Sequence, residues 1–268
     1  MRQLSLQEIK QIELDLLKKF DSFCKENHIR YFLSNGTLLG AIKYKGFIPW
    51  DDDIDVFVPR EDYNKILAIF KDDDKYKLFA FERDCKYRFP FAKLCDLNTK
   101  KEEQNTDNGV ILGVDIDIFP LDAWSDDLNK AKREVKIINK KMHLLGLTKL
   151  VKPDSANPIK RMIKRAVMIA LKVLGSKFFV RSIIDISQKN NGSESSYLGC
   201  KSWCIYGERE ILPAEVFSDI IDVEFEGLKF PAPEGYDMYL TSLYGNYRLD
   251  PPKEKQKTHH LFKAYKLH

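Results

Sequence analysis

Residues 50–58 read WDDDIDVFV and join four acidic residues to a run of apolar ones. Residues two apart on a strand point to the same face, so Asp53 and Asp55 share one face and the aliphatic residues around them share the other. Carboxylates this close repel each other, and a stretch selected for stability alone would avoid them. A hard divalent cation such as Mg²⁺ binds paired carboxylates and removes the repulsion. The stretch therefore predicts a strand that carries a metal site.

These acidic residues have two alternative interpretations besides a magnesium site: a calcium-binding loop and a solvated acidic turn. A calcium-binding loop needs a glycine and a distal glutamate where this chain has Val56 and Asp62, so that interpretation is excluded. A solvated acidic turn before a strand explains the first two aspartates well, but it explains Asp53 and Asp55 less well. On these residues alone, the metal site and the acidic turn both stay open.

Two further segments strengthen the prediction of a catalytic site. In LSNGTLLG, Gly36 and Thr37 follow a short strand and begin a helix, where backbone N–H groups and a hydroxyl can bind phosphate. A plain strand–turn–helix is the structural alternative. The later GVDIDIFPLD places Asp115 and Asp117 on one face of a second strand, where a carboxylate can complete a metal site or accept a proton from an attacking hydroxyl. These are the parts of a metal-dependent nucleotidyltransferase.

The apolar pattern predicts alternating strands and helices, followed by a helical middle. Helices are expected at 5–27, from Pro59 and Arg60 onward, and at 125–147, 158–174 and 177–190. Strands are expected at 30–34 and 53–58, and near 76–82, 87–97 and 109–119. This order predicts an α/β (α+β) fold with helices flanking a mixed sheet. We expect a catalytic core over 1–125, a basic helical region over 126–195, and a mixed segment over 196–268 that completes the core.

Composition limits the cellular setting. The five cysteines are an odd number in a long chain, which predicts free thiols and a reducing, cytoplasmic location. Cys200 and Cys204 lack a matching second pair, so a zinc site is not favoured. No run of about 18 apolar residues predicts a membrane-spanning helix. The N-terminus carries acids and a capping-box pattern at Ser5 and Glu8, which indicates an amphipathic helix rather than a signal peptide.

The net charge of +4 is unevenly distributed. Residues 128–181 contain 15 Lys and Arg and two acids, a net +13, so the rest of the chain carries −9. This region lacks interleaved exposed aromatic residues and is apolar on one face, so we do not expect nucleic-acid binding. At 100° per residue, a helix over 158–174 places five basic residues on one arc and an apolar face opposite. Packing of that face on the core and contact with an anionic membrane both stay open.

The sequence resembles the LicD family, whose members are phosphocholine transferases related to fukutin and fukutin-related protein. The resemblance spans most of the chain and rests on LSNGTLLGAIKYKGFIPWDDDIDVFVPRED, FAKLCDLNT, DIFPLD and the C-terminal FEGLKFPAP and YLTSLYGNYRLDPPKEKQKTHH. It implies a nucleotidyltransferase-like core, a divalent metal (Mg²⁺ or Mn²⁺) and a CDP-linked donor. LicD members transfer phosphocholine from CDP-choline to a glycan hydroxyl, and the fukutin branch transfers other CDP-linked alditol phosphates.

The resemblance also implies roles for residues in matching positions. Asp53 and Asp55 would bind the metal, with Asp117 as the third carboxylate and Asp115 as the alternative. Gly36 and Thr37 would lie beneath the donor phosphates, and Lys93 would neutralise a phosphate. Further substrate-binding residues would be Trp50, Asp52, His259 and His260.

The implied reaction is attack of a sugar hydroxyl on the β-phosphorus of CDP-choline, with CMP leaving. The acceptor would be a glycan on a lipid carrier, such as a teichoic acid or lipopolysaccharide precursor. CDP-ribitol and CDP-glycerol stay open as alternative donors. A non-catalytic protein that binds glycan or lipid on the same fold is a further alternative, against which the intact Asp53, Asp55 and Asp117 argue.

Overall fold

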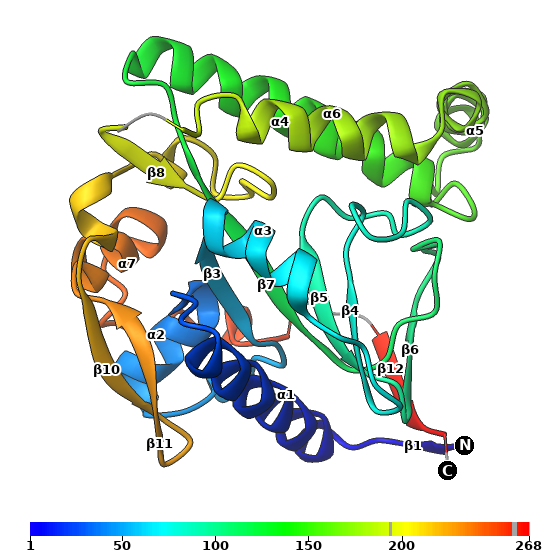
Figure 1. Cartoon of the computed structure of the whole chain (residues 1–268). Coiled ribbons are helices and arrows are strands. Elements are labelled where there is room, and N and C mark those ends of the chain that lie inside the picture. The colour runs from blue at the N-terminus through cyan, green and yellow to red at the C-terminus, as the bar shows by residue number, and fades with distance from the viewer. Residues whose placement is uncertain (193–194, 259–261, 268) are drawn as a thin grey trace.

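A computed structural model describes residues 1–192, 195–258 and 262–267, and this part has the expected mixed α/β fold (Figure 1). The central sheet has the order β2-β3-β7-β5-β4, with β8 paired to β7 and β9 paired to β8. Strands β3 and β7 run parallel, and the other pairs in this sheet are antiparallel. The strands are β2 (Phe32–Leu33), β3 (Asp55–Pro59), β4 (Tyr76–Phe79), β5 (Ala92–Asp96), β7 (Asp115–Ala123), β8 (Tyr197–Gly199) and β9 (Leu212–Pro213).

Helices surround this sheet. Helix α1 contacts β5 and β7, α3 contacts β3 and β7, and α2 contacts β3. Helices α4 and α6 lie side by side along the top of Figure 1, and α5 lies at their outer end. The helices are α1 (Leu6–Glu26), α2 (Asn35–Tyr44), α3 (Arg60–Ile69), α4 (Leu128–Lys149), α5 (Pro158–Leu174), α6 (Ser176–Gln188) and α7 (Tyr236–Tyr244), with short 3₁₀ turns at Gly207–Glu210, Ala214–Phe217 and Lys253–Lys255.

Two smaller sheets complete the fold. Strands β1 (Arg2–Gln3), β12 (Phe262–Lys266) and β6 (Thr99–Glu103) form one sheet, which joins the two ends of the chain. Strands β10 (Ile220–Phe225) and β11 (Leu228–Pro233) form a hairpin. Its two-residue turn has positive φ at Glu226 (51°) and Gly227 (73°), which matches the right-handed twist of the strands.

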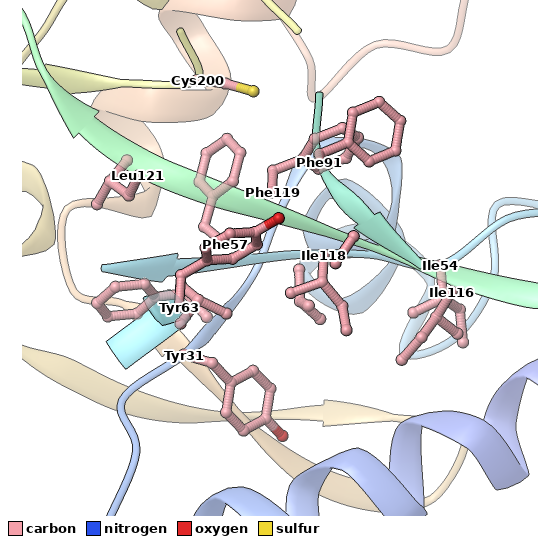
Figure 2. Close-up of a cluster of buried hydrophobic side chains, with 14 of the residues drawn as sticks. Tyr31, Ile54, Phe57, Tyr63, Phe91, Ile116, Ile118, Phe119, Leu121 and Cys200 are labelled. Carbon is pink, nitrogen blue, oxygen red and sulfur yellow. The ribbon is translucent and has the colours of Figure 1, made fainter. Parts of the chain in front are cut away.

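The core fills both faces of the β3–β7 pair. In Figure 2, Ile116 and Ile118 lie on the side of β7 toward α1, while Phe91 and Phe119 lie on the other side. The same alternation places Asp55, Asp115 and Asp117 on the Phe119 side, because residues two apart share a face. Strands β3 and β7 are therefore anchored through their apolar faces, as the sequence predicts. Asp53, however, lies outside the strand, because β3 begins at Asp55, two residues later than expected.

Some boundaries differ from those expected. The strand expected over 109–119 begins at Asp115 and runs to Ala123, because the N–H of Val114 donates to the Thr99 hydroxyl at 2.8 Å. Helix α4 begins three residues later than expected, where the Asp127 side chain accepts from the first-turn amides. Strand β6 was not predicted, because its sequence TKKEE has no alternation. No helix among the described residues is long and apolar enough to cross a bilayer.

Candidate active site

The parallel pairing of β3 and β7 places Asp55 directly beside Asp117. On the other side of β7, Asp117 is the register partner of Lys93 on β5. Neighbouring strands lie about 4.8 Å apart, so two carboxylates and an ammonium group form a row across the sheet. The Lys93 ammonium contacts Asp117 directly and donates to Asp115 Oδ1 at 2.8 Å. The sheet thus gathers three of the predicted site residues.

The first turn of α2 is fixed against the same strand. The backbone N–H of Asp55 donates to Thr37 Oγ1 at 2.8 Å, which links the turn to the start of β3. A Cβ added at Gly36 would lie 2.6 Å from Asp51 Oδ2, so the missing side chain lets the acidic loop approach this turn. The free amides of a helix N-terminus attract anions. The predicted phosphate turn is therefore in contact with the acidic strand.

Two cavities meet at the row of charged residues. The larger has a volume of about 930 Å³, the smaller about 330 Å³, and Asp53, Asp117 and Trp203 line both. The larger cavity is also lined by Gly36, Tyr44, Trp50, Asp55, Tyr206 and Tyr244. The smaller cavity is also lined by Glu13, Asp52, Phe89, Phe91, Lys93 and Asp115. Most of the predicted site residues thus line one continuous region of the surface.

The carboxylates in this region resist being ionised together. Burial raises the pKa of Asp55 well above its ordinary value, and the charges of Asp53 and Asp117 raise it further. Burial also raises the pKa of Asp117, although the Lys93 ammonium pulls in the opposite direction. Such groups carry full charge only when a cation joins them. The electrostatics therefore favour a positively charged ligand at this place.

Asp115 has a different environment from Asp117. Although burial acts in the other direction, Lys101 and Lys93 lower the pKa of Asp115 to about 2. Lys101 Nζ lies 2.5 Å from Asp115 Oδ2, so each carboxylate oxygen is next to an ammonium group. Asp115 thus serves as the counter-ion of two buried lysines. Asp117, which lines both cavities, is the better candidate for the third carboxylate.

The oxygen ligands of this region fit Mg²⁺ or Mn²⁺. Asp53, Asp55 and Asp117 all line the larger cavity. Within the described residues, no three Asp, Glu, His or Cys side chains are close enough together to hold an ion by themselves. Magnesium is usually bound by one or two carboxylates together with waters and substrate phosphates. The residues present therefore fit a cation whose coordination a bound diphosphate completes.

Two other predicted residues are placed beside this site. Trp50 lines the larger cavity, and its ring packs edge-on against Tyr44 with the centroids 6.2 Å apart. Thr37 is buried, with its hydroxyl next to the backbone of Asp55. Its contact with a donor phosphate stays a prediction, and the observed contact gives it a role in positioning β3.

The C-terminal segment contacts the acidic loop through Thr258. Asp52 is buried and accepts a hydrogen bond of 2.6 Å from the Thr258 hydroxyl. Thr258 also lines the larger cavity. The predicted substrate-binding residues His259 and His260 lie outside the described residues, and their role stays a prediction.

Glu13 was not predicted from the sequence as a site residue. This residue of α1 is 2% exposed and lines the smaller cavity. Burial raises its pKa well above the ordinary value, and Asp53 raises it further. Glu13 lies between the buried Ile9 and Leu17 at helical spacing, where the pattern predicts an apolar residue. A charged residue at a position where the pattern predicts an apolar one is the signal in the sequence that could have identified Glu13.

The second half of the chain supplies aromatic residues to both cavities. Trp203 lines both, and Tyr206 and Tyr244 line the larger one, with their hydroxyls 2.9 Å apart. The ring of Trp203 lies against Phe91, with the centroids 5.3 Å apart. No local pattern in the sequence distinguishes these rings from ordinary core aromatics.

Comparisons with known proteins show which family the chain resembles. Residues 28–143 match the family described as LicD/FKTN/FKRP, nucleotidyltransferase domain. The chain is 30% identical, over 271 residues and the whole of both chains, to the lipopolysaccharide cholinephosphotransferase LicD of Haemophilus influenzae. Shorter stretches are similar to uncharacterised proteins of Rickettsia typhi (41% over 59 residues; 21% of this chain and 19% of that one) and Rickettsia prowazekii (43% over 47 residues; 18% of each). The chain belongs to the LicD family.

Proposed function

We propose that this protein transfers phosphocholine from CDP-choline to a hydroxyl group of a glycan, with a divalent cation bound at Asp53 and Asp55, and releases CMP. The proposal rests on the pairing of Asp55 with Asp117 where the two cavities meet. Similarity along the whole chain to a lipopolysaccharide cholinephosphotransferase supports choline as the transferred alcohol and a glycan as the acceptor. The proposed acceptor is a glycan on a lipid carrier.

The larger cavity suits the CMP half of the donor. Gly36 brings the N-terminal amides of α2 to its wall, and these amides favour a phosphate group. Lys255 and Lys257 line the same cavity and add positive charge, whereas Lys43 is paired with Asp250. The ring of Trp50 offers a surface for the cytosine base. A donor bound in this way has its diphosphate beside the carboxylate row.

The smaller cavity suits the choline group. Quaternary ammonium groups are held by aromatic faces, and Phe89, Phe91 and Trp203 are neighbours here, with centroids 5.4 and 5.3 Å apart. Ammonium groups already lie over these rings: Lys93 Nζ is 5.5 Å from the Phe91 centroid and Lys149 Nζ is 3.2 Å from that of Phe89. These rings therefore attract cations, and we propose that choline binds the ring surface that the two lysines leave open.

The chemistry is a substitution at the β-phosphorus. The glycan oxygen forms a bond to phosphorus as the bond to the bridging oxygen breaks, and that oxygen leaves with its electron pair on CMP. Asp117 accepts the hydroxyl proton, and its raised pKa suits a general base. Lys93 holds Asp117 in position. A divalent cation at Asp53 and Asp55 supplies positive charge to the diphosphate oxygens. Positioning by these residues contributes much of the rate.

The test is release of CMP, measured by chromatography, with Mg²⁺, a lipid-linked glycan fraction, and CDP-choline, CDP-ribitol or CDP-glycerol as donor. We expect release that depends on the glycan and is fastest with CDP-choline. Asp117→Ala should lower turnover by about 10²-fold or more while CDP-choline still binds. Exposed Asp74→Ala is the matched control. Faster turnover of CDP-ribitol or CDP-glycerol would show that the donor is that compound and not CDP-choline. Binding of the glycan without turnover of any donor would contradict an enzymatic role.

A further inference from the structure

Helix α5 exposes its apolar face to solvent. The sequence of α5 places an apolar arc opposite a basic one. One interpretation of this pattern is that the apolar arc packs on the protein core. The structure contradicts that interpretation. Six large apolar side chains of α5 are between 57% and 85% exposed: Ile159, Met162, Ile163, Ile169, Val173 and Leu174. Val167 on the same arc is 40% exposed. The apolar arc of α5 therefore has no partner within the described chain.

The helix is attached to the protein through its opposite side. Met168 is the buried residue of α5, and Leu171 is partly buried against the core. At 100° per residue, these two side chains project roughly 120–180° away from the centre of the apolar arc. Helix α5 contacts α4 and α6 at the outer edge of the molecule (Figure 1). Its apolar arc therefore points away from the protein body.

Basic side chains flank this apolar arc. Lys160, Arg165 and Lys172 are exposed on the two borders between the arc and the protein. Residues 158–174 contain no acid, and the surrounding region 128–181 has a net charge of +13. Phe178, which follows α5 closely in the chain, is also exposed. An apolar surface bordered by positive charge is complementary to an anionic, water-excluding medium.

We propose that α5 docks the protein on an anionic lipid bilayer, with its apolar arc in the headgroup boundary and Lys160, Arg165 and Lys172 on lipid phosphates. The arc is convex and about 160° wide, which suits a fluid apolar layer better than the narrow seam of a helix pair. Pairing of α5 with a second copy would also bring together two helices that carry only positive charges. The helix lies in the interface and does not cross it.

The experiment is sedimentation of the full chain with vesicles at low and high salt. One set of vesicles is phosphatidylcholine alone, and the other is equal parts phosphatidylcholine and phosphatidylglycerol. We expect the wild type to pellet with the anionic vesicles at low salt and less at high salt, because each basic residue adds a screened attraction. Little should pellet with phosphatidylcholine alone. A wild type that stays in the supernatant with anionic vesicles would overturn the proposal.

Two variants separate the roles of charge and apolar contact. Lys160→Glu/Arg165→Glu/Lys172→Glu should weaken partitioning about a hundredfold. Ile163→Gln/Ile169→Gln/Val173→Gln should weaken it about tenfold or more. These side chains are exposed, so thermal unfolding should stay unchanged. If the apolar variant fails to fold, Val173→Gln alone, at the most exposed position of the arc, should still weaken binding several-fold.

Matched controls change the same properties elsewhere. Lys71→Glu/Lys86→Glu/Lys229→Glu carries the same change in net charge, and Ile111→Gln/Met238→Gln removes exposed apolar side chains outside α5. Both should bind vesicles as the wild type does. If the apolar α5 variant also binds as the wild type does, the arc is not inserted. If the wild type is a dimer without vesicles and the apolar variant is a monomer, the face is a contact between copies. Either result would overturn the proposal.

Discussion

Asp55 is a buried carboxylate at the start of β3, and the carboxylates of Asp53 and Asp117 are close enough to raise its pKa. Its backbone is held by Thr37, and its register is fixed by β7, so the side chain cannot move away from the repulsion. A protein keeps such a group when a ligand removes the cost. This is the physical reason to expect a divalent cation here.

Asp55→Asn tests this reasoning through stability. The pKa of Asp55 is raised in the folded state above the ordinary 3.8. Above about pH 4 the folded state therefore binds more protons than the unfolded chain. For this reason the stability of the folded state falls as the pH rises. Without metal, the variant should therefore melt at a higher temperature than the wild type at pH 7.5 and nearly equally at pH 4. Each kcal/mol gained in the free energy of unfolding corresponds to a rise of roughly 2–4 °C in the melting temperature.

Asp55→Asn should no longer transfer phosphocholine. Its melting temperature should also no longer rise when Mg²⁺ is added, as that of the wild type should. Asp53→Asn should also lose both. Asp74→Asn should keep both, because Asp74 is exposed in the loop between α3 and β4 and lines neither cavity. Near-normal transfer by either site variant, or an unchanged response to Mg²⁺, would contradict the assignment of Asp53 and Asp55 as ligands.

Lys149, at the end of α4, is a second buried charge with a measurable cost. Burial lowers its pKa from the ordinary 10.5 to about 7. Below pH 7 both the folded and unfolded states hold the proton, so the full cost of the buried charge is present, and it declines as pH rises toward 10.5. Lys149→Met should therefore raise the free energy of unfolding by on the order of 2–4 kcal/mol at pH 6.5 and by less at pH 9.

The control for Lys149 lies on the same helix. Lys140 is exposed, so Lys140→Met should change the free energy of unfolding by less than about 0.5 kcal/mol at either pH. Chemical denaturation at the two pH values gives both quantities. A gain for Lys149→Met that increases with pH would show that the ammonium group is not buried in the folded protein.

At the scale of elements, the first turn of α2 decides how the donor is held. Gly36→Ala places a methyl group 2.6 Å from Asp51 Oδ2, so either the acidic loop or the turn must move. We expect affinity for CDP-choline, measured by calorimetry, to fall about tenfold or more. Gly146→Ala in α4 is the matched control, because a Cβ there meets nothing within 4 Å. That variant should keep its affinity and gain about 0.5–1 kcal/mol of stability. Equal affinities in the two variants would mean that the turn does not contact the donor.

The elements differ in how well their sequences predicted them. Helix α5 has the predicted bounds, and α1 has the predicted capping box, since both signals are local. The strand that carries Asp55 was also predicted, because alternation over a few residues decides it. Strand β6 escaped prediction, because its polar sequence becomes a strand only by pairing with β12 from the end of the chain. Pairing between distant segments leaves no local pattern.

At the scale of the whole molecule, the site depends on segments that are far apart in sequence. The parallel register of β3 and β7 brings Asp117 to Asp55, and β5 adds Lys93. The alternation of acids predicted which residues face the same way, and the resemblance to a family predicted their roles. Neither predicted that Trp203 joins the two cavities or that α1 contributes Glu13, because those contacts arise only from tertiary packing.

The whole molecule also separates two functions in space. The carboxylate row lies at the central sheet, whereas α5 lies at the outer edge beside α4 and α6 (Figure 1). The vesicle variants in α5 should therefore leave CDP-choline affinity unchanged, and the variants of Asp53 and Asp55 should leave vesicle binding unchanged. Calorimetry and sedimentation on the same preparations check both. A loss of donor affinity in the α5 variants would show that the two surfaces are coupled.

The most direct measurement is a crystal structure of the protein with CDP-choline and Mn²⁺, using anomalous scattering to locate the metal. We expect an anomalous peak bound by Asp53 and Asp55, with the diphosphate beside Asp117 where the two cavities meet. CMP should occupy the larger cavity and choline the smaller one, against Phe91 and Trp203. A diphosphate bound away from this row, or a metal bound without Asp53 and Asp55, would contradict the central claim.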